Sequence, residues 1–494
     1  MEKSPPTLQG RIIALLFFLC RLRPVRWFAD RCCLNQVRMP KADVVEVVTD
    51  VVLNHYREHK LEAALDARQA RVYQKVHFRQ QIRALQRRLS AVPSGLKGSQ
   101  SAERYEKLVS FYRTRSQELN DLDHPAAIID YLAGYYIEDM AANFDPAFFV
   151  VFRSIARRIF PNFVNSIRLS ESEPGVVAQI RELMGKSPVF ILPNHVSNAD
   201  HIPICFAING FGGLQPVIAA GANLFRGVSA DIMPKVNAYK IRREQIGADS
   251  TWFYQLKWFH NPIYRRVHTE YLHHLWDRNE PMMFYIEGTR SRDGSIGEPK
   301  WGIMEDIAAY IKKTGRHAYL VPVSISYTVV PEDVEIEASR SGKNISEKDL
   351  VSQLARLDRH YKSLPDSAIH VRFSRPIMFG PDQPKVQPVV SQLMHAISQG
   401  MIRTYTSMLA TAIIGVGEGK KEITFTLEEI HDFFLEYFSA VPECRDQDVA
   451  HQLMMALTIF LQKGFVVQGE VGEGYQVANP PLIEQYARRI GHLH

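Results

Sequence analysis

The chain has 494 residues, 46% of them hydrophobic and 23% charged, so it can bury a large core in roughly two to four domains and is not a disordered chain. Its formal net charge of +6 suits anionic substrates or an anionic membrane surface, although many soluble enzymes share such a mild excess. The cysteines have no paired spacings, which excludes a disulfide framework or a zinc site and favours a reducing compartment. They are Cys20, Cys32, Cys33, Cys205 and Cys444.

The first apolar run, Ile12–Cys20, is too short to span a membrane, which takes about 20 residues. Arginines follow it instead of a small-residue cleavage site, so a signal peptide is not expected. They are Arg21, Arg23, Arg26 and Arg31. Because Trp27 and Phe28 lie among them, the segment is either an interfacial helix on anionic lipid or a core helix of a helical domain.

Residues 41–90 are predicted to form a long helix with its apolar side chains on one side and arginines around the rest. The apolar positions are Val72, Val76, Ile82, Leu85 and Leu89. Pro93–Ser101 predicts a linker or loop, and Ala102–Leu122 predicts a second helical stretch. These elements make up an expected N-terminal helical region, residues 1–122.

From about residue 145 the pattern changes to strands alternating with helices, beginning with an amphipathic helix at Phe148–Phe160. The predicted strands are Val189–Pro193, Val217–Ala220, Met283–Ile286, Tyr319–Tyr327 and Ile369–Phe373. The predicted helices include Trp252–Arg278, Gly302–Thr314 and Leu350–Leu364. Such alternation predicts an α/β domain, residues 123–417, with a central sheet flanked by helices.

The C-terminal region, residues 418–494, is predicted to hold two helices, a hairpin and a final helix. This order is also the outline of a winged helix. The last helices lack a basic cluster, so no nucleic-acid partner is expected. The preceding segment, Met401–Val416, is too polar for a confident membrane span.

A candidate catalytic pair follows the strand at Val189–Pro193. His195 lies on the loop, and a helix with Ser197 or Asn198 as its N-cap is expected to cover Ala199–Ile208. Asp200 then falls in the first turn, where its carboxylate meets the imidazole and gains from the helix dipole. A His held by an Asp is a general base in one tautomer. The alternative is a structural loop His beside an ordinary N-terminal helix acid.

Two further stretches carry candidate ligands for a phosphorylated substrate. Arg242-Arg243 follows a short apolar element, and adjacent arginines bind phosphate well, although exposed Arg pairs are common. Glu287-Gly288-Thr289-Arg290-Ser291 follows a buried strand; Glu287 can accept a hydrogen bond from a substrate hydroxyl and Arg290 can fork onto a phosphate. The alternative is a solvated polar turn. Lys300, which opens the next helix, adds a cation.

The strand Leu320–Tyr327 is interrupted by Pro322. Proline cannot donate to the ladder, so this is expected to be an edge strand or a bulge that lines the site.

These blocks together resemble the glycerolipid acyltransferase family. The motifs that carry the resemblance are Asn-His-x-Ser-x-x-Asp at 194–200, the Arg pair at 242–243, Glu-Gly-Thr-Arg-Ser at 287–291 and Val-Pro-Val at 321–323, in the family's order. The resemblance is closest to bacterial glycerol-3-phosphate acyltransferases, with Ser-Arg-Asp-Gly at 291–294, Pro-Lys-Trp-Gly at 299–302 and Ser-Ile-Ser-Tyr…Val-Pro-Glu at 324–332. It covers residues 145–494. Asn237, Lys240 and Thr289 depart from the bacterial pattern, which leaves the acyl acceptor open.

The resemblance implies transfer of an acyl group from a thioester, either acyl-CoA or acyl carrier protein, to glycerol-3-phosphate, with no cofactor or metal. His195 would be the general base and Asp200 its partner. The expected substrate-binding residues are Arg242, Arg243, Glu287, Gly288, Thr289, Arg290, Ser291, Lys300 and Pro322, the last in the acyl-donor channel. The enzyme is expected to work peripherally at the cytoplasmic face of the inner membrane. Lysophosphatidate or another lysolipid as acceptor, and a non-catalytic lipid-binding scaffold, are the alternatives.

Overall fold

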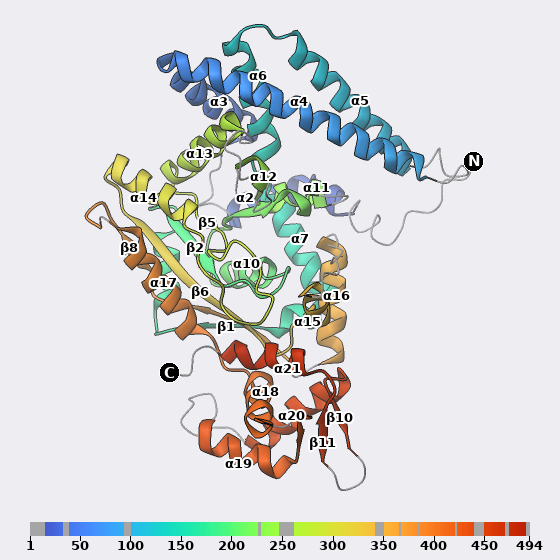
Figure 1. Ribbon diagram of the computed structural model, residues 1–494. Helices are drawn as coiled ribbons and strands as arrows, with labels where there is room; N and C mark the ends of the chain where they lie inside the picture. Colours follow the sequence, from blue (N-terminus) through green and yellow to red (C-terminus); the bar gives the residue numbers. More distant parts are fainter. Residues whose placement is uncertain are drawn as a thin grey trace.

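The computed structural model describes residues 15–32, 39–92, 100–225, 229–246, 261–340, 350–364, 367–383, 385–419, 422–438, 449–469 and 474–490. Most of the predicted linker at 93–101 and the first part of the helix predicted over 252–278 lie outside these ranges. The described molecule has three tiers (Figure 1): helices α3 to α6 at one end, a central sheet with helices on both faces, and a small C-terminal region at the other end.

The central sheet has eight strands in the order β1-β7-β6-β2-β5-β3-β4, with β8 paired to β6. The pairs are parallel except where β6 meets β7 and β8. The strands are β1 (Ile167–Glu171), β2 (Val189–Pro193), β3 (Val217–Gly221), β4 (Ala238–Ile241), β5 (Met282–Met283), β6 (Ala318–Tyr327), β7 (Ile369–Phe373) and β8 (Ile377–Phe379). The predicted α/β fold is confirmed, and β1, β4 and β8 are the strands that the sequence pattern missed.

Strand β2 shows why the apolar run in the sequence is continuous. Val189 and Ile191 belong to the core on one face of the sheet, whereas Phe190 and Leu192 belong to the core on the other. Successive side chains of a strand point to opposite faces, so a strand buried on both sides has no polar positions. The first core is covered by α7 (Pro146–Ile159), α8 (Pro161–Ser166), α9 (Val176–Leu183), α10 (His201–Gly210) and α16 (Leu350–Ser363).

The second core joins the sheet to the N-terminal helices. It is covered by α3 (Lys41–Glu58), α4 (Lys60–Ser90), α6 (Pro125–Met140), α13 (Pro262–Asp277), α14 (Gly302–Thr314) and α17 (Val386–Gly400). Val48 of α3 and Phe78 of α4 share this core with Phe190 of the sheet. Packing is therefore continuous across residue 122, where the sequence pattern placed a boundary.

The single helix predicted over 41–90 is two helices, because His59 leaves helical geometry (φ −117°, ψ 62°) between α3 and α4. Its predicted apolar face is also wrong in part: Val72 is 60% exposed, and α4 instead buries Gln74 and Phe78. Helix α5 (Gln100–Asp121) packs along α4, and in Figure 1 the two helices lie above α11 (Ser229–Ile232) and α12 (Arg243–Ile246).

The C-terminal region has a core of its own. Its buried side chains come from residues 408–486, and Val329 and Leu364 join them from the central part of the chain. Its elements are α18 (Tyr405–Val416), β9 (Thr424–Phe425), α19 (Leu427–Phe438), α20 (Val449–Gln462), β10 (Val466–Gln468), β11 (Tyr475–Val477) and α21 (Pro480–Ala487). The strands pair in the order β10-β11-β9, which is a winged-helix arrangement. Helix α18 packs in this core although the sequence pattern assigned it to the preceding domain.

Pro322 is not on an edge strand, which corrects the first of the two expectations. Strand β6 lies inside the sheet between β2 on one side and β7 and β8 on the other. The carbonyl of Pro322 accepts from Ser374 N at 3.0 Å, so its backbone faces the turn where β7 gives way to β8. The missing N–H therefore costs no ladder hydrogen bond.

No helix in the described ranges combines the length and the apolar content that crossing a bilayer requires.

Candidate active site

The candidate site lies beyond the carboxyl ends of parallel strands, where open α/β sheets bind their ligands. His195 follows β2, Arg242 follows β4, and the segment from Tyr285 to Arg292 follows β5. All three segments contribute to one cavity of about 1140 Å³. The parallel order of β2, β5, β3 and β4 thus brings together motifs that are far apart in the sequence.

His195 and Asp200 form the predicted pair. His195 Nδ1 lies 2.8 Å from Asp200 Oδ2, and the Asp200 side chain is fully buried while that of His195 is 16% exposed. The carboxylate accepts the Nδ1–H, which leaves Nε2 as the nitrogen that can take a proton. Helix α10 begins at His201, two residues later than predicted, so Asp200 is its N-cap residue.

Asp200 is held by three further donors. Its carboxylate accepts from Val196 N at 2.7 Å, from Ser197 N at 2.9 and 3.0 Å, and from the Tyr327 hydroxyl at 2.7 Å. Charge-assisted hydrogen bonds of this kind stabilise a buried carboxylate and fix its position. The motif is therefore a closed turn in which Asp200 organises the backbone that carries His195.

The imidazole of His195 is fixed from its face as well. It stacks on the ring of Tyr285, with centroids 3.9 Å apart and planes at 12°. The preceding residue, Asn194, exchanges two hydrogen bonds with the backbone of Ile325 in β6, at 3.1 and 2.7 Å. Side-chain pairing with a buried strand thus anchors the start of the loop, and the ring orientation follows from stacking and from Asp200.

Glu287 supports this loop instead of facing the cavity, which differs from its predicted contact with substrate. One carboxylate oxygen accepts from His195 N at 2.7 Å and the other from Gly297 N at 2.6 Å. The residue is 2% exposed and does not line the cavity. Burial raises the pKa of Glu287 to about 7, against the two backbone donors, which lower it.

The rest of the Glu-Gly-Thr-Arg-Ser motif divides between the loop and the cavity. Ser291 N donates to the carbonyl of His195 at 2.9 Å, so both backbone groups of His195 are bonded to this segment. Gly288 has φ 68°, and a Cβ there would come within 2.8 Å of Lys300 Cγ. Gly288, Thr289 and Arg290 line the cavity, whereas Ser291 and Lys300 do not, and neither does Pro322.

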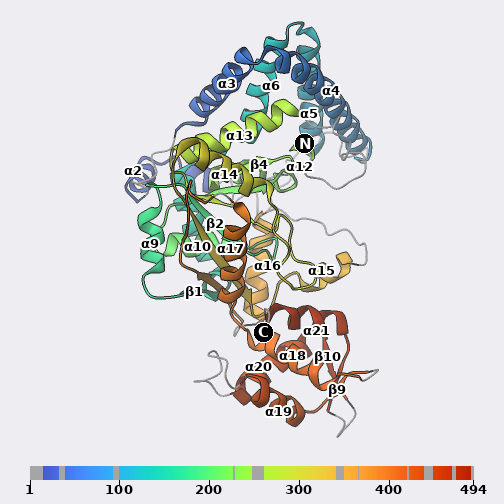
Figure 2. The same cartoon turned by 60° about the vertical axis from the view of Figure 1, so that its left-hand side comes forward.

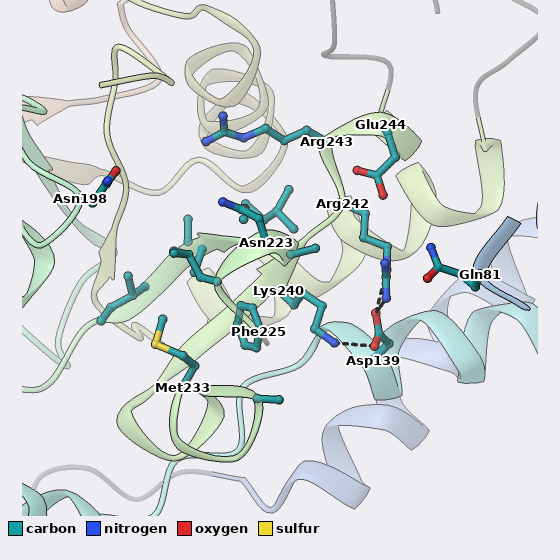
Figure 3. A pocket seen from close by; sticks show the side chains of 18 of the residues that line it. Gln81, Asp139, Asn198, Asn223, Phe225, Met233, Lys240, Arg242, Arg243 and Glu244 are labelled. Carbon is teal, nitrogen blue, oxygen red and sulfur yellow. Dashed lines mark hydrogen bonds and ion pairs between the residues drawn. The ribbon is translucent and has the colours of Figure 1, made fainter. Parts of the chain in front are cut away.

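The predicted arginine pair has two different environments, as Figure 3 shows. Arg242 turns to Asp139 of α6, with Nε and one terminal nitrogen both 2.9 Å from Oδ2. Lys240 reaches the other oxygen of Asp139 at 2.6 Å. Burial would raise the pKa of Asp139, but these two cations outweigh it and hold the pKa below its usual range. Arg243 points the other way and is exposed.

Several residues that position the pair were not assigned a role from the sequence. Ser197 Oγ donates to Glu332 Oε2 at 2.7 Å, and Glu332 is paired with Arg356 of α16 at 2.9 Å. Tyr327 and Glu332 stand in the stretch at 324–332 that carried part of the resemblance. Arg356 had no such signal, because its role depends on where α16 packs.

The sequence also gave no sign that the N-terminal helices reach the site. Side chains of α4 and α5 form part of the cavity wall, among them Arg88, Arg104 and Phe111. Another cavity residue, His201, is largely buried, and this lowers its pKa to about 4. Within the described ranges, no cluster of three or more His, Cys, Asp or Glu side chains is arranged to hold a metal ion.

Comparison with known proteins finds similarity in the central part of the chain. Residues 174–326 match the family model described as acyltransferase. A glycerol-3-phosphate acyltransferase of Pseudoalteromonas translucida is 30% identical over 198 residues, which is 40% of this chain and 22% of that protein. The enzyme of the same name from Alteromonas mediterranea is 29% identical over 199 residues, again 40% and 22%. The chain thus spans about a fifth of the length of these curated relatives.

Among solved structures, the 1-acyl-sn-glycerophosphate (LPA) acyltransferase PlsC of Thermotoga maritima aligns with 59% of this chain and 87% of that chain. The TM-score is 0.28 and the identity is 12%.

Proposed function

We propose that this chain, whose residues 174–326 match the acyltransferase family model, transfers a fatty acyl group from acyl-CoA or acyl carrier protein to the hydroxyl of glycerol-3-phosphate. The observation that carries the proposal is the pairing of His195 with buried Asp200 at a cavity that Arg243 and Arg290 also line. A base next to guanidinium groups is what acylation of a phosphorylated alcohol requires.

In this proposal His195 Nε2 removes the proton of the acceptor hydroxyl as the oxygen attacks the thioester carbonyl. Asp200 keeps the imidazole in the Nδ1–H tautomer and stabilises the imidazolium that forms. The tetrahedral intermediate collapses, the thiolate leaves, and it takes up the proton from the imidazolium. No acyl-enzyme forms, and the step draws on no cofactor or metal.

The acceptor phosphate is assigned to Arg243 and Arg290, which line the cavity. Arg242 is a weaker candidate for this role because two of its nitrogens already contact Asp139. Fixing the phosphate holds the hydroxyl near His195, and such positioning supplies a large share of the rate. Glu287 acts on the base through the backbone and does not hold a substrate hydroxyl.

We further propose peripheral binding at the cytoplasmic face of the inner membrane through residues 15–28. One side of this segment is buried against α7, with Leu16 and Cys20 in the core. The other side exposes large apolar groups between arginines: Leu15, Phe18, Leu22, Trp27 and Phe28. Apolar groups beside cations suit an anionic bilayer surface. This favours the interfacial interpretation, although the inner face is packed as a core helix would be.

The test is thiol release from palmitoyl-CoA, and from palmitoyl-acyl carrier protein, with glycerol-3-phosphate, lysophosphatidate or dihydroxyacetone phosphate as acceptor. We expect release with glycerol-3-phosphate, and a loss of roughly 100- to 10,000-fold in His195→Ala. His395→Ala, an exposed position on α17, is the matched control. Release with lysophosphatidate alone would make lysophosphatidate the acceptor in place of glycerol-3-phosphate. A folded His195→Ala protein with wild-type turnover would refute the mechanism.

A further inference from the structure

The cavity carries more positive charge than the acceptor can use. Seven cations line it, Arg88, Arg104, Lys240, Arg242, Arg243, Arg290 and Arg292, against two carboxylates, Asp139 and Glu244. The described lining therefore has an excess of five positive charges. A phosphate monoester carries about −1.5 to −2 at pH 7, so one acceptor phosphate balances less than half of this excess.

Two of these cations come from a part of the chain that lies outside the family match. Arg88 is on α4 and Arg104 is on α5, whereas the match begins at residue 174. In Figures 1 and 2 the α4–α5 pair lies on the far side of α12 from α10, so Arg88 and Arg104 reach the cavity from other elements than the one that follows His195. Gln81 of α4 lies beside the Arg242–Asp139 pair (Figure 3), so the α4–α5 wall adjoins the part of the cavity that follows β4 at this point.

The same wall also carries aromatic side chains, and the Phe111 ring already has the Arg115 guanidinium 5.4 Å from its centroid. Tyr105, Phe111 and Tyr112 of α5 line the cavity, and Phe111 is 42% exposed. The rings of Phe111 and Tyr112 are edge to face, with centroids 5.4 Å apart. Cations that alternate with aromatic rings are suited to a nucleotide, because the base stacks on a ring while the phosphates meet the guanidinium groups.

We propose that the α4–α5 wall binds the phosphorylated adenosine of a coenzyme A thioester, with Arg88 and Arg104 on its phosphates and the α5 aromatic residues on its base. This rests on the proposed function and narrows its donor to acyl-CoA. The pantetheine arm separates the thioester from the nucleotide, so a protein that brings the thioester to His195 must hold the phosphates at a distance. Arg88 and Arg104 line the same cavity as His195 but stand on a separate pair of helices, which is the arrangement that such a donor requires.

Acyl carrier protein has the same pantetheine arm but no nucleotide, and its acidic surface would be met by cations on an outer helix face. Such cations exist on α4, for example Arg83 and Arg87, which are exposed and do not line the cavity. An acyl-CoA donor thus depends on Arg88 and Arg104, whereas an acyl carrier protein donor depends on Arg83 and Arg87. The nucleotide is favoured because aromatic side chains of α5 line the cavity together with Arg88 and Arg104.

The experiment compares Arg88→Gln/Arg104→Gln with Arg83→Gln/Arg87→Gln in the full chain. For the cavity pair we expect the KM for palmitoyl-CoA to rise roughly 10- to 100-fold, since each lost charge-assisted contact weakens binding about tenfold at exposed sites. The KM for palmitoyl-pantetheine, which lacks the nucleotide, and the KM for glycerol-3-phosphate should not change. The control pair should behave as the wild type with all three.

Titration calorimetry with coenzyme A alone gives a readout independent of turnover, and the cavity variant should bind it at least tenfold more weakly. The inference would be overturned if the cavity variant kept its KM for palmitoyl-CoA, or if its KM for palmitoyl-pantetheine rose by the same factor. It would also be overturned if only the KM for the acceptor rose, or if the wild type accepted acyl carrier protein alone as donor. If no thioester is consumed with any acceptor, the proposed function fails, whereas calorimetry still decides whether this wall binds the nucleotide.

Discussion

Replacing Glu287 with glutamine should change how the stability of the protein depends on pH. Burial raises the pKa of Glu287 from 4.5 to about 7, so between these values the folded chain holds a proton that the unfolded chain has released. Stability therefore falls as the pH rises through this window. One pKa unit corresponds to about 1.4 kcal/mol, so the group accounts for about 3 kcal/mol over the window and about 2 kcal/mol between pH 5 and pH 7.5.

The measurement is urea unfolding of the wild type and Glu287→Gln at several pH values in this range. The carboxamide of the variant cannot titrate, so the difference in unfolding free energy between the two proteins isolates this group from all others. We expect the wild type to lose about 2 kcal/mol relative to the variant from pH 5 to pH 7.5. Glu298→Gln, an exposed neighbour in the same loop, is the control. A difference that stays constant with pH would refute the reasoning.

The same variant tests the role of Glu287 in activity. A carboxylate accepts from both His195 N and Gly297 N, whereas a carboxamide has one acceptor oxygen and turns an NH₂ group toward the other donor. We expect kcat to fall roughly tenfold with little change in the KM for glycerol-3-phosphate, since an unpaired buried donor costs about 1–3 kcal/mol. A raised KM for glycerol-3-phosphate at unchanged kcat would instead support the contact of Glu287 with a substrate hydroxyl that the sequence predicted.

Three further changes separate the remaining roles. Tyr327→Phe removes a 2.7 Å hydrogen bond to buried Asp200 and should lower kcat roughly 10- to 100-fold at unchanged KM; steady-state kinetics with an unaffected kcat would contradict this. Arg243→Ala should raise the KM for glycerol-3-phosphate about tenfold and leave the donor KM alone, and the opposite pattern would move Arg243 to the donor. Trp27→Glu/Phe28→Glu should reduce flotation with anionic vesicles roughly 100-fold, and unchanged flotation would exclude residues 15–28 as the membrane contact.

Local sequence determined the strands and helices that frame the site. The run at Val189–Pro193 matched β2 to the residue, and Gly302–Thr314 matched α14, because continuous burial and helical periodicity are written in neighbouring residues. The short strand β5 was predicted over 283–286, yet only Met282–Met283 pair, since its length is set by the neighbouring strands. Strand β4 was missed for a similar reason, because Ala238 and Tyr239 are buried in the two cores on opposite faces of the sheet by elements distant in the sequence.

The pairing of His195 with Asp200 was predictable because both partners lie within one turn, where backbone geometry limits what they can contact. The environments of Arg242 and Glu287 were not predictable, because each is fixed by a residue far away in the sequence. Asp139 occupies two nitrogens of Arg242 within the cavity wall, and the backbone N–H groups of His195 and Gly297 occupy the carboxylate of Glu287. The sequence by itself thus determined the fold class and the His195–Asp200 pairing. Only the tertiary structure decided which of the predicted site residues face the cavity, since hydrogen bonds and ion pairs between distant segments depend on how the helices and strands pack.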